Sequence, residues 1–219
     1  MSTRDRLLAA VRSGLGPTRT PPDAIAAEAS ALLADPDAIR PRLAAPALDE
    51  AFSIRATALG TTVDRVAALA DVPAAVGRYL EGHGLGPGVA VQPAPAFAGL
   101  DWEGDRGAIR PHATLAPDEP VALGIARWGI AESGSLVVHS APDTPILLAF
   151  LPLHHILVLP VGRILPHLED YAAAEGGSAA PRNAVLVTGP SGTTDIEGSY
   201  VRGAHGPGFL HVILVDSPA

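Results

Sequence analysis

His-Val-Ile-Leu-Val, residues 211–215, is the stretch that decides the fold. Four consecutive branched apolar side chains leave neither face of a strand polar, and such strands are typical of a parallel sheet that is buried on both faces. Ala-Val-Leu-Val, residues 184–187, has the same character. Because runs of this kind alternate with helical patterns from Thr61 onward, the sequence predicts an α/β fold with a mostly parallel sheet and flanking helices.

The other predicted elements follow from the same alternation. Strands are expected over residues 61–63, 89–91, 108–113, 121–127, 134–139, 155–160, 183–187 and 210–216, and helices over 64–80 and 163–174. The strands 121–127 and 134–139 lie so close in the chain that a tight turn is expected to join them.

The N-terminal part of the chain differs from the rest. Residues 1–58 are rich in Ala, Leu, Pro and charge. Ser2 or Thr3 can cap a first helix whose apolar residues recur at helical spacing until Gly16, and a second short helix is expected over residues 23–33. The sequence therefore predicts an N-terminal helical segment, residues 1–58, that packs on an α/β domain formed by residues 59–219.

The composition excludes several kinds of chemistry. The 219 residues contain no cysteine, which rules out a disulfide framework, a thiolate nucleophile and an iron–sulfur cluster held by this chain. All 15 basic residues are arginine, so no lysine can form a Schiff base. A net charge of −8 disfavours nucleic acid and anionic membranes as partners. We find no secretory signal and no apolar run of the ~20 residues that a bilayer span needs, and expect a cytoplasmic protein.

Residues 188–198, Thr-Gly-Pro-Ser-Gly-Thr-Thr-Asp-Ile-Glu-Gly, form the densest group of polar side chains and glycines. Exposed amides and hydroxyls in a glycine-rich turn can cradle an anion or a sugar. The alternative is a capping box, in which Thr194 and Glu197 begin a helix. The candidate binding residues are Gly189, Pro190, Ser191, Thr193, Thr194, Asp195 and Glu197.

Two further loops contribute candidates. In residues 131–135, Ala-Glu-Ser-Gly-Ser, Glu132 could act as a nucleophile or general base, or it could be a solvated turn carboxylate. Its neighbours Ser133, Gly134 and Ser135 are candidate binding residues. In residues 202–208, Arg-Gly-Ala-His-Gly-Pro-Gly, His205 and Gly206 lie in an exposed turn whose imidazole could titrate near neutral pH. Sites in such folds lie at one edge of the sheet, where these loops could converge.

The histidines do not predict a metal site. His154 and His155 are adjacent, so on a strand they point to opposite faces, and no pair has the spacing of a helical zinc site. No Gly-x-Ser-x-Gly elbow supports a Ser-His-Asp triad.

Four motifs in order resemble the LUD-domain family, and within it the lactate-utilisation type. They are Ile-Ala-Glu-Ser-Gly-Ser-Leu-Val-Val (130–138), Leu-Pro-Leu-His-His-Ile-Leu-Val-Leu (151–159), Gly-Pro-Ser-Gly-Thr-Thr-Asp-Ile-Glu (189–197) and Gly-Ala-His-Gly-Pro-Gly-Phe-Leu-His-Val-Ile-Leu-Val (203–215). The resemblance covers residues 61–216. Gly192 stands where the family pattern has a basic residue, which weakens the case for a phosphate or carboxylate contact at that point.

The resemblance implies a fold similar to that of the sugar-phosphate isomerase, glucosamine-phosphate deaminase and CoA-transferase superfamily. It also implies an accessory role beside two cysteine-rich iron–sulfur proteins that oxidise L-lactate to pyruvate, with no cofactor bound by this chain. Two alternatives stay open. One is an enzyme of that superfamily that uses Glu132, and the other is a module that binds a small carboxylate or a sugar derivative.

Overall fold

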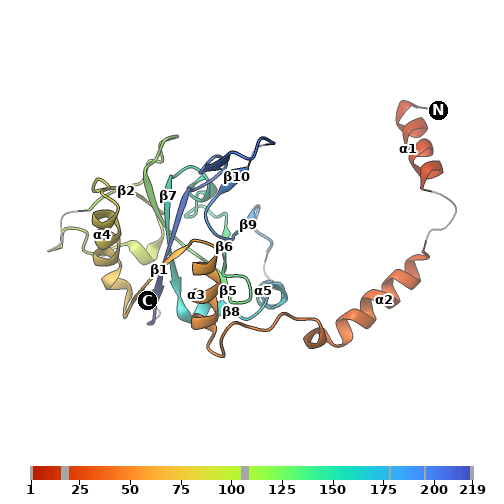
Figure 1. The fold of residues 1–219 in the computed structure, drawn as a ribbon, viewed down its shortest axis with the longest axis horizontal. Coiled ribbons are helices and arrows are strands. Elements are labelled where there is room, and N and C mark those ends of the chain that lie inside the picture. The colour runs from red at the N-terminus through yellow and green to blue at the C-terminus, as the bar shows by residue number, and fades with distance from the viewer. Residues whose placement is uncertain (1, 16–19, 105–108, 178, 195, 218–219) are drawn as a thin grey trace. The chain divides into compact units, whose positions relative to one another are not determined.

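The structure is a computed structural model that describes residues 2–15, 20–104, 109–177, 179–194 and 196–217 (Figure 1). Contacts within the chain define two compact units, Met1–Pro41 and Arg42–Ala219.

The smaller unit consists of the helices α1 (Thr3–Gly14) and α2 (Pro22–Ala34), followed by the short 3-10 helix η1 (Pro36–Ala38). Ser2 caps α1 as expected, because its hydroxyl accepts a hydrogen bond from the Asp5 backbone while the Asp5 carboxylate accepts one from the Ser2 backbone. None of the described residues of either helix is buried. The predicted helical extension is therefore present, and its packing on the main domain stays a prediction.

The larger unit is built on a six-stranded parallel sheet, which confirms the predicted fold class. In spatial order its strands are β1 (Thr62–Val66), β12 (Phe209–Val215), β7 (His154–Pro160), β4 (Val121–Ile125), β2 (Gly88–Val91) and β3 (Arg110–His112). The stretch that predicted the fold, residues 211–215, lies in β12 between two parallel neighbours and is buried throughout.

Both faces of this sheet are covered, as the apolar runs require. Alternate residues of β12 belong to different cores, since Ile213 and Val215 pack with α4 (Val72–Gly82), whereas Val212 and Leu214 pack with α3 (Leu48–Ala58). Figure 1 shows the two helices on opposite sides of the central strands.

A second sheet of four strands lies within the same unit. Its order is β8 (Ile164–Leu165), β5 (Trp128–Ile130), β6 (Ser135–His139) and β9 (Ala184–Val187). The expected hairpin between residues 121–127 and 134–139 is wrong in its first strand, because β4 belongs to the parallel sheet and β5 pairs with β6 instead. The run 184–187 is also not a doubly buried strand. As β9 it pairs antiparallel with β6 at the sheet edge, and its residues alternate between exposed and half-buried.

Two helix predictions need correction at their N-terminal ends. Residues 64–66 continue β1, where they pair with β12, and α4 begins only at Val72. Pro73 in the first turn fits a helix start there, because the missing N–H of proline is not needed at that point. The second helix, α5 (Leu168–Glu175), follows the 3-10 helix η5 (Val161–Arg163) and the strand β8. In the described ranges no helix has both the length and the apolar character needed to cross a membrane.

The units divide between Pro41 and Arg42, not at residue 58. Helix α3, which the sequence prediction assigned to the N-terminal segment, belongs to the larger unit because Ala51, Phe52 and Ala56 are fully buried in the core that it shares with β12.

Candidate functional site

A chain of three hydroxyls joins two of the loops predicted to carry the site. The hydroxyl oxygens of Ser133 and Ser135 lie 2.8 Å apart, and that of Ser135 lies 2.7 Å from the Thr188 hydroxyl. Ser135 is the first residue of β6 and Thr188 directly follows β9, so the antiparallel pairing of these strands brings the loops together.

Backbone hydrogen bonds join the third loop to this group. The Ser191 N–H donates to the Pro207 carbonyl at 2.8 Å, and the Gly203 N–H donates to the Ser191 carbonyl at 2.9 Å. Gly206 leaves room for the Ser191 side chain, since a Cβ built on it would lie 3.4 Å from the Ser191 Cβ. The three loops therefore meet, and we call residues 133–135, 188–191 and 203–208 the amino-edge cluster.

The name describes its position. Residues 203–208 precede the first residue of β12, so the cluster lies at the amino ends of the parallel strands. The far end of β12 is six residues away, or about 20 Å at ~3.3 Å per residue. Ligands of open parallel sheets bind beyond the carboxyl ends of the strands, and this cluster lies at the other edge.

Glu132 points to a different neighbour. Its Oε1 accepts a hydrogen bond of 2.8 Å from the backbone N–H of Leu168, the first residue of α5. The N-terminal N–H groups of a helix have no partner within the helix, so this carboxylate stabilises the start of α5. This capping contact by itself accounts for a glutamate in this turn.

Two glycines of the amino-edge cluster are required by packing. Gly134 has a φ of +69°, and a Cβ there would overlap the backbone nitrogen of Ala56 in α3. Gly189 has a φ of +80°, and its Cβ would lie 3.1 Å from the Cβ and carbonyl oxygen of Leu59. Both conformations are rare for residues that carry a Cβ. Gly60 belongs to the same turn as Leu59, and Pro190 lies beside it.

The capping-box alternative for residues 188–198 is wrong. Thr193 and Thr194 lie in β10 (Gly192–Thr194), which pairs with β11 (Tyr200–Arg202) as a two-stranded hairpin. Glu197 is exposed in the turn between these strands, and Asp195 lies outside the described residues. His205 is exposed, as its place in a turn predicts.

A cleft with a volume of about 550 Å³ lies at the opposite, carboxyl edge of the parallel sheet. It is lined by residues at or just beyond the ends of β2, β4, β6, β7 and β12, and we call it the carboxyl-edge cleft. Its polar lining residues are Gln92, Arg127, His139, Asp143, Thr144, Arg163 and Ser217, and its larger apolar ones are Leu69, Ile125, Val158 and Val215. None of the residues selected from the sequence lines it.

Gln92 fixes one wall of this cleft. It is buried, its Oε1 accepts a hydrogen bond of 2.9 Å from the Ile125 N–H, and its amide nitrogen donates to the Thr144 hydroxyl at 2.9 Å. Thr144 closes a tight turn with Ala141 through two backbone hydrogen bonds. Since all these groups are paired, the wall is preorganised before any ligand arrives.

The two arginines of the cleft differ in their partners. Arg127 donates two hydrogen bonds to the Glu175 carboxylate, at 2.6 and 3.0 Å, and the Trp128 indole donates a third at 2.7 Å. These bonds, those from Arg127 first, lower the pKa of Glu175 to about 2, so the positive charge of Arg127 is compensated. The Arg163 guanidinium lies 4.8 Å from the centre of the Trp128 ring. It forms no ion pair with any described carboxylate.

His139 brings an imidazole to the same cleft. Its Nε2 lies 2.8 Å from the Tyr171 hydroxyl, and burial lowers the pKa of the ring. The side chain is therefore neutral at pH 7, where it offers a hydrogen-bond donor or acceptor and no charge.

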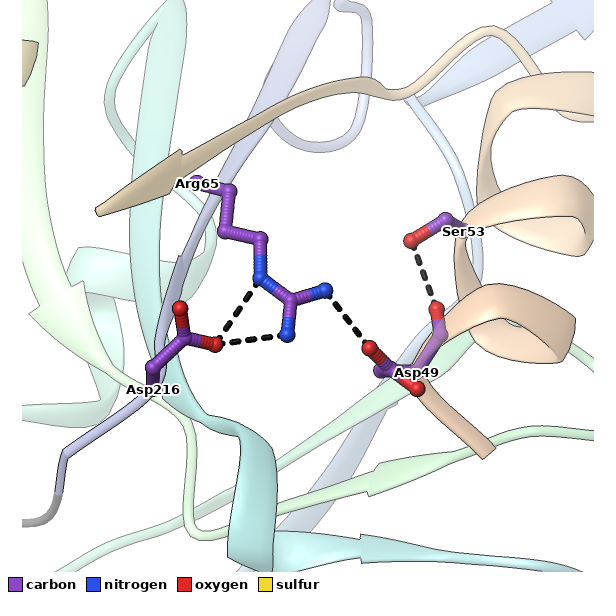
Figure 2. A network of polar contacts seen from close by, with 4 residues as sticks. All are labelled: Asp49, Ser53, Arg65 and Asp216. Atoms are coloured by element: carbon purple, nitrogen blue, oxygen red, sulfur yellow. Dashed lines mark hydrogen bonds and ion pairs between the residues drawn. The ribbon is translucent and has the colours of Figure 1, made fainter. Parts of the chain in front are cut away.

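Arg65 secures the strand end that borders the cleft (Figure 2). Its guanidinium donates to Asp216 from Nε at 2.8 Å and to Asp49 of α3 from Nη1 at 2.6 Å. Asp216 directly follows β12, and the next residue, Ser217, lines the cleft while its N–H donates to the Ala67 carbonyl. The network thus ties β1, α3 and the end of β12 together.

Sequence reasoning missed this cleft because it selected glycine-rich loops. The available signal was polar residues within two positions of the end of an apolar strand, such as Gln92 after residues 88–91 and Arg127 after residues 121–125. Their meeting depends on strand order, which motif spacing does not show.

Comparisons with known proteins agree with this architecture. The family model described as LUD domain matches residues 50–215. The chain is similar to a protein named "Lactate utilization protein C" from Geobacillus thermodenitrificans, with 28% identity over 66% of this chain and 69% of that protein. It is similar to a protein of the same name from Geobacillus kaustophilus, with 29% identity over 67% and 69%. A crystal structure of a DUF162 family protein from Deinococcus radiodurans has the same fold, with a TM-score of 0.51 and 22% identity, over 77% of this chain and 96% of that one.

Proposed function

This chain belongs to the LUD domain family, and on that premise we propose that it serves in lactate utilisation, as an accessory subunit of a cytoplasmic complex that oxidises L-lactate to pyruvate. The observation that carries the proposal is the alignment of two thirds of the chain with relatives named lactate utilization protein C.

The chemistry of the reaction determines which proteins of the complex must hold the redox group. Conversion of L-lactate to pyruvate releases two electrons and two protons, so the complex needs a redox group. Without cysteine this chain offers no thiolate ligand for an iron–sulfur cluster. We therefore assign the clusters to two cysteine-rich partner proteins and the handling of substrate or of partner contacts to this chain.

The β10–β11 hairpin supports a subunit role. Ile196 in its turn is fully exposed, and Tyr200 and Val201 of β11 are 60% and 49% exposed. Neighbouring exposed apolar side chains mark surfaces for contact with other proteins. We propose that this hairpin faces a partner, together with the adjoining Ser191 and His205 of the amino-edge cluster.

Catalysis by Glu132 has less support. Its carboxylate already accepts a hydrogen bond at the start of α5, and a capping role accounts for it. The amino-edge cluster also lies about 20 Å along β12 from the edge where ligands of parallel sheets bind.

Deletion of the gene, combined with purification of the tagged chain, tests the proposal. The deletion strain is expected to grow on glucose but not on L-lactate. From cells grown on L-lactate, the tagged chain is expected to co-purify with cysteine-rich iron–sulfur proteins and with L-lactate-dependent dye reduction. An Ile196→Asp, Tyr200→Asp variant should lose the partners while keeping its unfolding midpoint. Normal growth of the deletion strain on L-lactate would overturn the proposal.

A further inference from the structure

We propose that the carboxyl-edge cleft binds 2-hydroxy and 2-oxo monocarboxylates that carry an apolar group, with Arg163 holding the carboxylate and His139 contacting the oxygen on the neighbouring carbon. This inference deepens the proposed function by naming a substrate class and a site, and it rests on that function only for lactate as the physiological member of the class.

The charged side chains of the cleft favour a ligand that carries a single negative charge. Arg127 is neutralised by its two hydrogen bonds to Glu175, whereas Arg163 pairs with no carboxylate in the part of the chain that the structure describes. A ligand carboxylate would give Arg163 the charge-assisted partner that the protein does not provide. Asp143 lines the same cleft, and its negative charge disfavours a second anionic group on the ligand.

The ring of His139 supplies a contact for an uncharged oxygen. Its Nε2 is bonded to the Tyr171 hydroxyl, while among the described residues its Nδ1 has no hydrogen-bond partner. Burial also lowers the pKa of the ring and so favours its neutral form. A neutral imidazole with one nitrogen fixed by Tyr171 can accept a hydrogen bond from a hydroxyl or, in the other tautomer, donate one to a keto oxygen. A 2-hydroxy or 2-oxo group beside the carboxylate can form this hydrogen bond with His139.

The volume and the apolar lining of the cleft favour acids larger than lactate. A volume of about 550 Å³ falls in the ordinary range for sites that enclose drug-sized ligands. Its lining includes the apolar side chains of Leu69, Ile125, Val158 and Val215. An apolar group on the ligand would bury surface against these side chains and add affinity. The cleft should therefore bind phenyllactate more tightly than L-lactate.

Calorimetric titration of the purified full-length chain tests the inference directly. The probes are phenyllactate, L-lactate, pyruvate, succinate and inorganic phosphate. We expect saturable binding of the first three, tightest for phenyllactate, and weaker binding of the two dianions. Arg163→Gln should weaken phenyllactate binding by about tenfold or more, the effect of losing one charge-assisted hydrogen bond. Arg182→Gln, which removes an exposed arginine from a loop outside the cleft, should leave binding unchanged.

Three results would overturn the inference: no saturable binding of any monocarboxylate at concentrations up to about 10 mM; tighter binding of succinate or phosphate; or binding that Arg163→Gln does not weaken. Because Arg163 is exposed, the variant should fold, and an unchanged unfolding midpoint verifies this.

Growth on L-lactate is measured separately. Phenyllactate binding through Arg163 with normal growth of the deletion strain would refute the proposed function alone, whereas absent binding with lost growth would refute this inference alone.

Discussion

At the scale of single residues, Gly134 shows how one missing atom permits the contact between the β5–β6 hairpin and α3. A Cβ at this residue would overlap the Ala56 backbone, and its φ of +69° adds strain. Gly134→Ala is therefore expected to reduce the free energy of unfolding by about 3 kcal/mol. Gly84→Ala is the matched control, because Gly84 has a φ of +63° with open space around it and should cost only about 1 kcal/mol. Urea unfolding of both variants measures the difference, and equal losses would show that packing against α3 contributes nothing.

Glu132 separates a capping role from a catalytic one. Its Oε1 accepts the Leu168 N–H, so Glu132→Ala should cost about 1 kcal/mol of stability and speed hydrogen exchange at Leu168. Glu132→Gln keeps an oxygen acceptor and should lose much less. A carboxylate nucleophile or base would be lost in both variants, so abolished L-lactate-dependent dye reduction in the glutamine variant, with its stability intact, would restore the catalytic alternative.

At the scale of secondary-structure elements, Arg65 holds three elements at the end of β12. It bonds to Asp49 of α3 and to Asp216 beyond β12, and the hydrogen bond from Arg65 to Asp49 lowers the pKa of that carboxyl. The Arg65 side chain is 51% exposed, so solvent screens the pair. Arg65→Met should cost about 1 kcal/mol at low salt and less in 1 M NaCl, because surface ion pairs are weak and screened. Unfolding at the two salt concentrations tests this, and a loss that is independent of salt would show that the aliphatic part of the side chain is what matters.

Residues 184–187 and 211–215 show how far the sequence predicts the elements. Both are apolar runs, and both form strands. Only the second is doubly buried, because tertiary packing decides which strand has neighbours on both sides, and composition carries no such information. The three-residue strand β5 was missed for a related reason. A strand of that length has no measurable periodicity, and its Gly129 is explained only by the side chains packed against it, Leu159 closest and then Phe52 and Ile164.

At the scale of the whole molecule, the parallel fold and its family resemblance could be read from the sequence, whereas the cleft could not. The motifs selected the loops around Ser135, Ser191 and Gly206 but did not show whether they converge, and in the structure they meet. The motifs did not indicate the other edge of the sheet, where Gln92 follows β2 and Arg163 ends the 3-10 helix η5, far apart in the chain. Strand order places them together, and strand order follows from packing.

Two buried histidines predict how stability depends on pH. Burial lowers the pKa of both His155 and His211 to about 4. Because their folded pKa lies below the unfolded value of about 6.5, the unfolded state binds more protons between these values, so stability rises with pH across this window. Their contribution is fully present above pH 6.5 and is lost as the pH falls toward 4, by up to about 3 kcal/mol for each histidine.

Proton uptake measures this effect without a variant. Calorimetric unfolding at pH 5.5 in two buffers of different ionisation enthalpy should show uptake of about two protons from these histidines. A free energy of unfolding that stays constant between pH 7 and pH 5 would mean that the two rings bind protons equally in the folded and the unfolded protein, which would contradict their lowered pKa.

Growth of the deletion strain on L-lactate, with the gene restored in three forms, tests most directly whether this chain serves lactate utilisation through its carboxyl-edge cleft. We predict that the wild-type gene and the Arg182→Gln gene restore growth, while the Arg163→Gln gene produces a folded protein that does not. Restoration by Arg163→Gln at the wild-type rate would contradict a role for the cleft, and unimpaired growth of the deletion strain itself would contradict a role in lactate utilisation.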